Sequence, residues 1–330
     1  MNRHLPLTTS PLEASVHTLN LGTEGPSVGR VGLGCMGMSW GYDQEGWDDA
    51  TSVRVIHQAI DTGVRFFDTA DQYGPFTNER LVGKALRDRR DEVVLATKGG
   101  LIVDGARRTH RNGRPEHLRA ACEASLLRLG TDHVDLYQLH RVDPAVPVEE
   151  SWGAMAELVE AGLTKAIGLS EASVDEISRA HAIHPVTSVQ SELSLWSPDA
   201  TGDVVPYCAE QGITFIAFAP LGRGFLSGRI TTVEDLPRVD ARRGIPRFQP
   251  DAIAANQAIT ETTGRIAARL GITVPQLAIA WVLAQGPGVM ALPGTKTPKY
   301  LEENVAAGAV TLPAEALAEL ADLPAAVGSR

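Results

Sequence analysis

The sequence is poor in cysteine and has no long apolar run, and each shortage argues against a class of protein. Cys35, Cys122 and Cys208 lie far apart and form no Cys-x-x-Cys pair, so neither a disulfide framework nor a structural zinc site is indicated, and reduced thiols are expected. No run of about 18 apolar residues is present, so no transmembrane helix is predicted. Residues 1–6 lack the apolar core of a signal peptide, and we therefore expect a cytoplasmic protein.

Positive charge is also scarce. The 330 residues include 30 lysines and arginines against 40 aspartates and glutamates, which gives a formal net charge of −10. Nucleic acids and anionic membranes both require a basic surface, so neither is expected as a partner. The nine histidines show no metal-ligand spacing and no H-E-x-x-H motif, and no metal is expected.

Two glycine-containing stretches imitate nucleotide-binding motifs without the context that these motifs need. Gly32-Leu33-Gly34-Cys35-Met36-Gly37 matches G-x-G-x-x-G, but that fingerprint binds a dinucleotide only where it opens a helix. Residues 38–43 have no helical pattern, and helical spacing begins only at Asp48. Gly83-Lys84-Ala85 lacks the glycine spacing and the hydroxyl residue of a P-loop. Neither a Rossmann domain nor a P-loop fold is therefore predicted.

What the sequence does contain is a regular alternation of short apolar runs and segments with helical spacing. The runs, which we interpret as buried strands, cover residues 31–34, 66–69, 93–97, 134–139, 166–170, 188–192, 214–218 and 289–292. The helical segments cover residues 48–62, 78–86, 115–129, 148–161, 173–181, 204–211, 256–270 and 275–285. Eight repeats of strand and helix predict an α/β protein of the (β/α)₈ TIM-barrel class.

The regions outside this alternation complete a single predicted domain, residues 1–330. Residues 1–27 contain a polar leader and the first part of a β-hairpin, whose strands, residues 16–21 and 28–33, flank a turn-rich segment. Two long stretches without helical spacing, residues 99–114 and 222–250, follow predicted strands. Loops of this length in a compact barrel are usually lids or walls of a binding site, so we expect long active-site loops here.

Three of the predicted strands end in ionisable residues. The strand at residues 66–69 delivers Asp68 and, five positions later, Tyr73. The strand at residues 93–97 ends before Lys98, and the strand at residues 134–139 ends before His140. Because the carboxyl ends of parallel strands gather on one face of a barrel, we expect these four side chains to converge.

These residues resemble the aldo-keto reductase family, whose members are (β/α)₈ oxidoreductases that use NADPH without a Rossmann fold. The resemblance covers nearly the whole chain and is specific. It implies that Asp68, Tyr73, Lys98 and His140 are the catalytic tetrad, that NADP(H) is the cofactor and that a small carbonyl compound is the substrate. The motifs that carry it, besides the tetrad, are Gly32-Leu33-Gly34, Phe67-Asp68-Thr69-Ala70, Gly168-Leu169-Ser170, Pro293-Gly294-Thr295-Lys296 and Glu302-Glu303-Asn304.

The chemistry of carbonyl reduction gives each of the four residues a task. Negative charge develops on the carbonyl oxygen as hydride reaches the carbon, so a proton donor must stand at that oxygen, and Tyr73 is the candidate general acid. The ammonium of Lys98 is expected to lower the pKa of Tyr73 by favouring the phenolate. Asp68 would supply the counter-charge that a buried ammonium needs. His140 would donate a hydrogen bond to the carbonyl and orient it.

By resemblance, further residues would contact NADP(H). The chain departs from the family pattern at Glu171, where asparagine is frequent, at Phe218-Ala219, where Tyr-Ser is frequent, and at Tyr300, where one branch has arginine, so the preference for NADP would depend on Lys296, with Lys299. The implied contacts are Gly34, Cys35, Met36 and Asp68 near the nicotinamide, Ser170 and Gln190 at its carboxamide, Phe218 on its ring, Ala219, Pro220, Leu221 and Arg223 under the pyrophosphate, Gly294, Thr295, Lys296 and Tyr300 near the 2′-phosphate, and Glu303 and Asn304 at the adenine.

The sequence as a whole predicts an NADPH-dependent reductase of aldehydes, ketones or sugar-like carbonyls that also works in reverse as an alcohol dehydrogenase. Trp40 and Tyr42, with Tyr73 and His140, are the expected substrate contacts. The oligomeric state is not readable from the sequence, and a monomer is compatible with it.

Two alternatives of other classes stay open on the sequence alone. One is an NADP-binding redox sensor or regulatory subunit that resembles the potassium-channel β subunits, although these have asparagine where His140 stands. The other is a metal-dependent barrel hydrolase that uses Asp68 and His140, which gives Lys98 and Lys296 no task.

Overall fold

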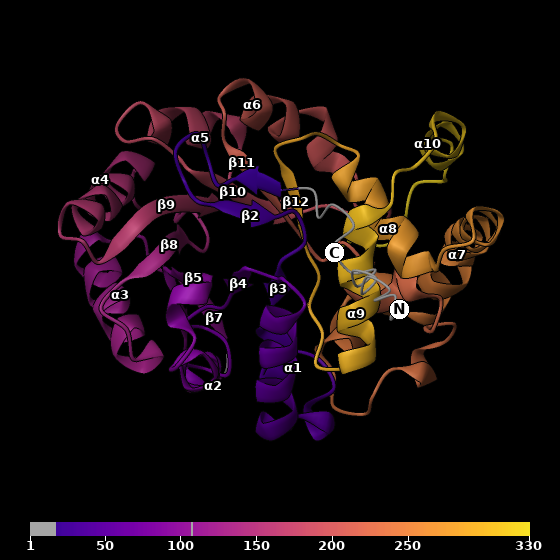
Figure 1. The fold of residues 1–330 in the computed structure, drawn as a ribbon, viewed down its shortest axis with the longest axis horizontal. Helices are drawn as coiled ribbons and strands as arrows, with labels where there is room; N and C mark the ends of the chain where they lie inside the picture. The colour runs from indigo at the N-terminus through magenta and orange to yellow at the C-terminus, as the bar shows by residue number, and fades with distance from the viewer. Residues whose placement is uncertain (1–17, 107) are drawn as a thin grey trace, which may run out of the picture.

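The computed structural model describes residues 18–106 and 108–330, and at its centre stands a barrel of parallel strands (Figure 1). Eight strands form one sheet in the order β12, β11, β10, β9, β8, β5, β4, β3. Parallel bridges from Ala291 to Val31 and from Gly294 to Gly34 close the sheet on itself, and the predicted (β/α)₈ class is confirmed. The strands are β3 (Leu33–Gly34), β4 (Phe66–Asp68), β5 (Val94–Gly99), β8 (Val134–Leu139), β9 (Thr164–Ser170), β10 (Ser188–Glu192), β11 (Thr214–Phe218) and β12 (Val289–Leu292).

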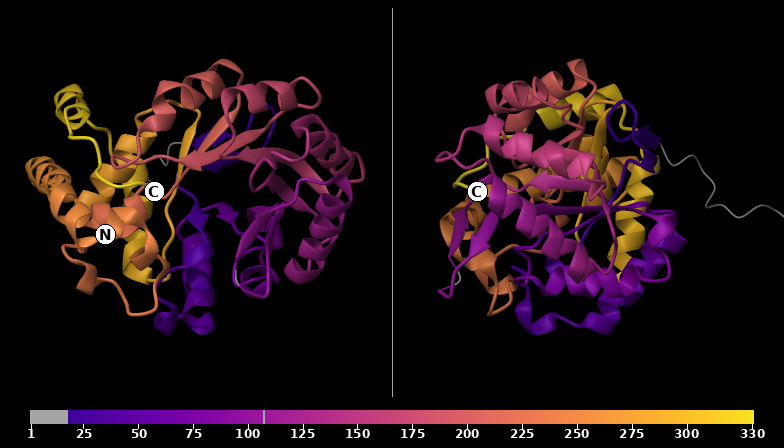
Figure 2. Two further views of the ribbon diagram at one scale, coloured as in Figure 1. Left: turned by 180° about the vertical axis from the view of Figure 1, so that it is seen from behind. Right: turned by 90° about the vertical axis from the view of Figure 1, so that its left-hand side faces the viewer.

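Helices surround the strands, and α7 and α10 lie farther out on one side (Figures 1 and 2). The sequence pattern located α1 to α8 but missed α9 and α10, because both follow the last barrel strand and lie beyond the alternation of strands and helices on which the prediction rests. The helices are α1 (Asp49–Asp61), α2 (Thr77–Leu86), α3 (Pro115–Leu129), α4 (Val148–Glu160), α5 (Val174–His181), α6 (Val204–Glu210), α7 (Pro250–Leu270), α8 (Val274–Leu283), α9 (Pro298–Ala306) and α10 (Ala314–Ala321).

Helix α8 is the most apolar helix of the molecule. Within residues 18–106 and 108–330, no single helix is long and apolar enough to cross a membrane, while α7 and α8 together reach that length and composition but meet at a bend of 91°. Nearly all of α8 is buried, and it belongs to the main hydrophobic core together with β12. Packing inside the protein therefore accounts for its composition.

A short hairpin covers the end of the barrel where the strands begin. It consists of β1 (Thr18–Asn20) and β2 (Ser27–Gly29), which are antiparallel, and it is shorter than predicted because residues 31–34 belong to the barrel. Residues 1–17 of the expected leader and first strand lie outside the described residues. Leu19, Leu21 and Val28 pack in one cluster with inward side chains of the barrel strands. The hairpin thus closes one end and leaves the other end for chemistry.

The two long loops contain more structure than the sequence indicated. Residues 99–114 were expected to be irregular, but β6 (Leu101–Val103) and β7 (Thr109–Arg111) pair there as an antiparallel hairpin. Residues 222–250 contain four short 3₁₀ turns, the first at Gly222–Ser227. Both segments follow the carboxyl ends of barrel strands, so they stand around the same end of the barrel as the predicted tetrad.

Candidate active site

The carboxyl ends of β4, β5 and β8 bring the four predicted catalytic side chains together. Lys98 Nζ lies 2.5 Å from Oδ2 of Asp68 and 3.3 Å from the hydroxyl of Tyr73. The rings of Tyr73 and His140 meet edge to face, with centroids 5.8 Å apart and an interplanar angle of 84°. All four side chains are buried. The convergence expected from the strand ends is therefore present in the structure.

The segment after β4 folds back so that Tyr73 reaches Lys98. The main-chain nitrogen of Asp71 donates to the carbonyl of Lys98 at 3.1 Å, which ties this segment to β5. Tyr73 N donates to the carbonyl of Ala70 at 3.2 Å and forms a tight turn. Gly74 then has φ +92°, a conformation that glycine adopts without the strain a side chain would bring.

Burial and charge act in opposite directions on Lys98 and Tyr73. Burial disfavours the ammonium of Lys98, but Asp68 and Tyr73 favour it more strongly, so the pKa of Lys98 is raised and the residue stays charged. For Tyr73, burial raises the pKa and Lys98 lowers it, and burial is the larger effect. Lys98 thus acts on Tyr73 in the expected direction, but burial outweighs it, and the pKa of Tyr73 lies above its ordinary value.

His140 is held as a neutral imidazole. Burial lowers its pKa well below the ordinary value, and the charges of Lys98 and Arg141 lower it further. Its Nδ1 is buried and has no hydrogen-bond partner among the described residues. A buried polar atom without a partner is costly, so this ring is suited to exchange a hydrogen bond with a ligand.

Two amide side chains hold Asp68 from the side opposite Lys98. Gln190 donates to Oδ1 of Asp68 at 2.9 Å, and Gln138 donates to the same oxygen at 3.1 Å. Gln190 was expected at the carboxamide of the cofactor, but here its amide nitrogen contacts the tetrad. Gln138 was missed, although it shares the inward face of β8 with His140 two residues later, and this alternation could have identified it.

The predicted nicotinamide contacts occupy the ends of neighbouring strands. Ser170, at the end of β9, accepts a hydrogen bond from Arg141 at 3.0 Å, and the same guanidinium donates to the carbonyl of His140 at 2.6 Å. Arg141 was missed by the sequence analysis. Phe218, at the end of β11, is half-buried. The other predicted contacts here are Gly34 and Met36, which are half-buried, and Cys35, which is fully buried.

Arg223, the predicted pyrophosphate clamp, already has a carboxylate partner. Its Nη2 lies 2.7 Å from Oε2 of the buried Glu192. Ala219 and Arg223 both have positive φ, +50° and +55°, so the loop that also contains Pro220 and Leu221 turns sharply after β11. Glu192 was not predicted as the partner of Arg223, because the pairing depends on the course of this loop.

The predicted substrate residues Trp40 and Tyr42 are both half-buried in the loop after β3. The guanidinium of Arg242 lies 4.8 Å from the ring centroid of Tyr42, and it is fixed by Asp240 at 2.7 Å. Tyr42 therefore belongs to a contact between two loops, and a substrate contact by this residue stays a prediction.

The segment after β12 carries the residues predicted at the 2′-phosphate and adenine. Lys296 pairs with Asp43 at 2.8 Å, and the guanidinium of Arg229 lies 3.9 Å from the ring centroid of Tyr300. A second cation thus reaches this end from the long loop after β11. Of the other predicted residues, Gly294 is exposed, Thr295 and Glu303 are half-buried, and Asn304 is buried in α9.

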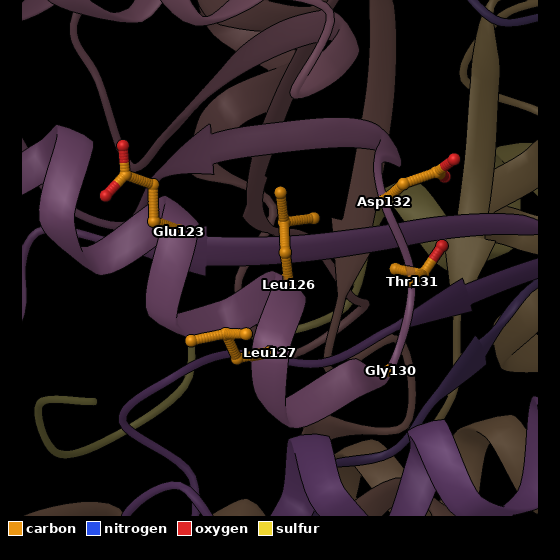
Figure 3. A pocket seen from close by; sticks show the side chains of 6 residues that line it. All are labelled: Glu123, Leu126, Leu127, Gly130, Thr131 and Asp132. Carbon is orange, nitrogen blue, oxygen red and sulfur yellow. The ribbon is translucent and has the colours of Figure 1, made fainter.

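Two hollows are formed by residues other than the tetrad. An open depression formed by Leu126, Leu127 and the turn at Gly130 lies where α3 ends, on the side of the barrel where the strands begin (Figure 3). A cavity of about 220 Å³ lies beside the ends of β9 and β10 and includes Glu171 and Arg330. Within the described parts of the chain, no group of three or more His, Cys, Asp or Glu side chains could hold a metal ion.

Comparisons with known proteins agree with this geometry. A family model described as the aldo/keto reductase family matches residues 30–324. A probable aldo-keto reductase 1 from Glycine max is 44% identical over 309 residues, which are 93% of this chain and 89% of the relative.

Solved structures give the same result. A glycerol dehydrogenase from Gluconobacter oxydans has a TM-score of 0.84 at 30% identity, covering 93% of this chain and 95% of its own. An aldo/keto reductase from Klebsiella pneumoniae in complex with NADP and acetate has a TM-score of 0.71 at 27% identity, covering 93% of this chain and 94% of its own. The chain belongs to the aldo/keto reductase family and is an oxidoreductase acting on carbonyl or alcohol groups.

Proposed function

We propose that this protein is an NADPH-dependent reductase of small carbonyl compounds, with Tyr73 as the general acid, and that it runs in reverse as an alcohol dehydrogenase. The observation that carries the proposal is the position of Lys98, whose ammonium lies between Asp68 and the hydroxyl of Tyr73, with the neutral ring of His140 beside Tyr73. Family membership and the NADP held by the Klebsiella relative support the cofactor.

The residues of the chain divide the proton chemistry among them. NADPH, when bound, supplies the hydride. Tyr73 gives its proton to the carbonyl oxygen, and the adjacent ammonium of Lys98 stabilises the phenolate that results. Because burial keeps the phenol protonated, Tyr73 is in the acid form when the carbonyl arrives. His140 donates a hydrogen bond that orients the carbonyl, as a neutral imidazole can.

The donor set at the mouth of the barrel fits a phosphorylated dinucleotide. Ser170 and the half-buried ring of Phe218 stand at the ends of β9 and β11 and suit an amide and an aromatic ring. Arg223 and Lys296 provide cations farther along, where phosphates would lie. Each of these cations has one carboxylate partner, so bound phosphates would compete with Glu192 and Asp43.

The substrate would be received between the loops around the tetrad. Trp40 and Tyr42 lie on one side of the mouth, and the β6–β7 hairpin stands on another. We infer only the class of carbonyl compounds, since these loops set the identity of the substrate and the tetrad does not.

Transfer of deuterium tests the proposed reaction directly. We would incubate the full chain with an aromatic aldehyde and with NADPH that carries deuterium at both hydrogen positions of C4 of the dihydronicotinamide, and analyse the alcohol by mass spectrometry and NMR. The proposal expects one deuterium on the former carbonyl carbon. Alcohol without deuterium there would contradict direct hydride transfer.

A further inference from the structure

Lys296, the residue proposed to bind the 2′-phosphate, already holds an anion from a distant part of the chain. Its Nζ lies 2.8 Å from Oδ2 of Asp43 and donates to the main-chain carbonyl of Asp43 at 3.0 Å. The side chains of Lys296 and Asp43 are 22% and 37% exposed, so a ligand from solvent can reach the pair. The positive charge of Lys296 is therefore already balanced by Asp43 when a phosphate arrives.

The loop after β3 holds Asp43 in a defined place. Asp43 has φ +44° and ψ +59°, a left-handed conformation that aspartate and asparagine adopt more readily than most residues. Its main-chain nitrogen donates to Oδ2 of the buried Asp240 at 2.8 Å. The carbonyl of Gly41 accepts from the nitrogen of Ala241 at 2.9 Å, and the nitrogen of Gln44 donates to the carbonyl of Val239 at 3.2 Å, so the loops after β3 and β11 are joined on both sides of Asp43.

Gly46 leaves the space that the pair occupies. A Cβ atom at this position would stand 3.0 Å from Nζ of Lys296 and would overlap the carboxylate of Asp43. Three segments, the loop after β3, the loop after β11 and the segment after β12, thus combine to keep one carboxylate on Lys296.

A 2′-phosphate cannot use Lys296 fully while Asp43 is paired with it. The phosphate must displace the carboxylate or bind beside it, and both cost binding free energy because the two anions repel each other. NADH has no 2′-phosphate and leaves the pair intact. The cost therefore falls on NADPH alone.

We propose that Asp43 is a specificity-determining residue, whose carboxylate competes with the 2′-phosphate of NADP(H) for Lys296 and so reduces the preference for NADP(H) over NAD(H). The inference rests on the proposed function, since it takes the 2′-phosphate to bind at Lys296. The loop after β3, which carries Asp43, would thus set the cofactor preference together with Lys296.

Replacement of Asp43 by asparagine isolates the charge. Asp43→Asn keeps the left-handed conformation and the main-chain bonds, and removes only the negative charge. Glu45→Gln is the matched control, because Glu45 lies two residues away and pairs with Arg238 at 3.1 Å instead of with Lys296. Calorimetric titration of the full chain with NADPH, NADH, 2′,5′-ADP and 5′-AMP measures each dissociation constant without turnover.

Asp43→Asn is expected to tighten NADPH and 2′,5′-ADP by about three- to tenfold, the scale of a partly exposed ion pair together with the relieved repulsion. The dissociation constants of NADH and 5′-AMP should change by less than about twofold, and Glu45→Gln should change none of the four. In a Lys296→Ala background, Asp43→Asn should tighten NADPH clearly less, because only the repulsion between Asp43 and the phosphate is then left to relieve.

Three results would overturn the inference. If Asp43→Asn weakens the binding of NADPH and NADH equally, the role of Asp43 is to hold the two loops together, and it does not compete with the phosphate. If it tightens NADPH equally with and without Lys296, the effect is general electrostatics. If the wild-type chain binds neither NADPH nor NADH, the proposed function fails, and this inference fails with it. The first two results would overturn the inference alone and leave the proposed function standing.

Discussion

At the scale of single residues, the buried Lys98 is surrounded by hydrogen-bond acceptors and a carboxylate that stabilise its positive charge. Lys98 has no exposed side-chain surface, yet it lies between the carboxylate of Asp68, the carbonyl of Thr69 and the hydroxyl of Tyr73. Gln138 and Gln190 satisfy the other oxygen of Asp68. A buried ion pair is stable only when hydrogen bonds satisfy its remaining polar atoms, so Gln138 and Gln190 help to stabilise the pair of Lys98 and Asp68.

A second buried acid, Asp71, has no such partner for its charge. Burial, with repulsion from Glu79, raises the pKa of Asp71 to about 8, and its Oδ1 has no hydrogen-bond partner among the described residues. The folded protein therefore holds a proton on Asp71 between about pH 4, the ordinary pKa of aspartate, and pH 8, while the unfolded chain releases it. The stability that Asp71 contributes is lost as the pH rises through about 8.

Asp71→Asn removes this titration. We expect the free energy of unfolding of the variant, relative to that of the wild type, to rise by a few kcal/mol between about pH 5 and pH 9, in the direction that proton linkage requires. Urea unfolding at a series of pH values measures it. The exposed Asp88→Asn is the control and should show no such trend. Parallel pH profiles of wild type and Asp71→Asn would show that Asp71 is ionised in the folded protein at neutral pH.

At the scale of elements, the β1–β2 hairpin acts as the floor of the barrel. Leu21 is only 1% exposed and packs in one cluster with Phe66, Ile216 and Met290 from three barrel strands. Leu21→Ala should lower the free energy of unfolding by about 2–5 kcal/mol, the cost of a cavity in a packed core. The dissociation constant for NADPH should stay the same, because the hairpin lies at the opposite end from the tetrad.

Leu127 provides the matched control for that substitution. Its side chain is 84% exposed on α3, so Leu127→Ala should change the free energy of unfolding by less than about 0.5 kcal/mol. Denaturant unfolding of wild type and both variants measures these changes in the free energy of unfolding. A cost for Leu21→Ala no greater than that for Leu127→Ala would mean that the hairpin does not seal the barrel.

The elements differ in how well the sequence predicts them, and burial explains the difference. All eight barrel strands are buried, so they read as apolar runs, and their positions were predicted to within two residues. The antiparallel β6–β7 hairpin is largely exposed and has no apolar alternation, so the sequence pattern predicts an irregular segment there. Helices α9 and α10 were missed for another reason, since both follow the last barrel strand and lie beyond the alternation of strands and helices.

The residues of the candidate site also differ in how well the sequence predicts them. Asp68, Lys98 and His140 were found because they stand at strand ends, where parallel topology alone brings residues together. Asp43, Glu192 and Arg229 were not found, because their partners are set by loops whose course no local pattern encodes. The lowering of the Tyr73 pKa by Lys98 was expected, but the larger opposing effect of burial was not, since burial of that ring depends on the whole mouth of the barrel.

At the scale of the whole molecule, the net charge works against a phosphorylated ligand. The chain carries a formal charge of −10, while NADPH is itself strongly anionic. Charges more than about 10 Å apart are largely screened at 0.1 M salt, so affinity must come from the cations at the mouth, chiefly Arg223, Lys296 and Arg229. The balance between these cations and their carboxylate partners therefore sets how tightly the cofactor is held.

The measurement that tests the central claim most directly compares wild type with Tyr73→Phe in two assays. The first follows NADPH oxidation at about 340 nm against aromatic aldehydes, dicarbonyls, pyridoxal and sugar ketones, and the second measures NADPH binding by calorimetry. Because Phe keeps the ring and removes only the acidic hydroxyl, turnover should fall by about 10² or more while the dissociation constant stays within about twofold. Full turnover by Tyr73→Phe would contradict Tyr73 as the acid, and tight NADPH binding by a wild type that reduces no carbonyl would contradict the reductase itself.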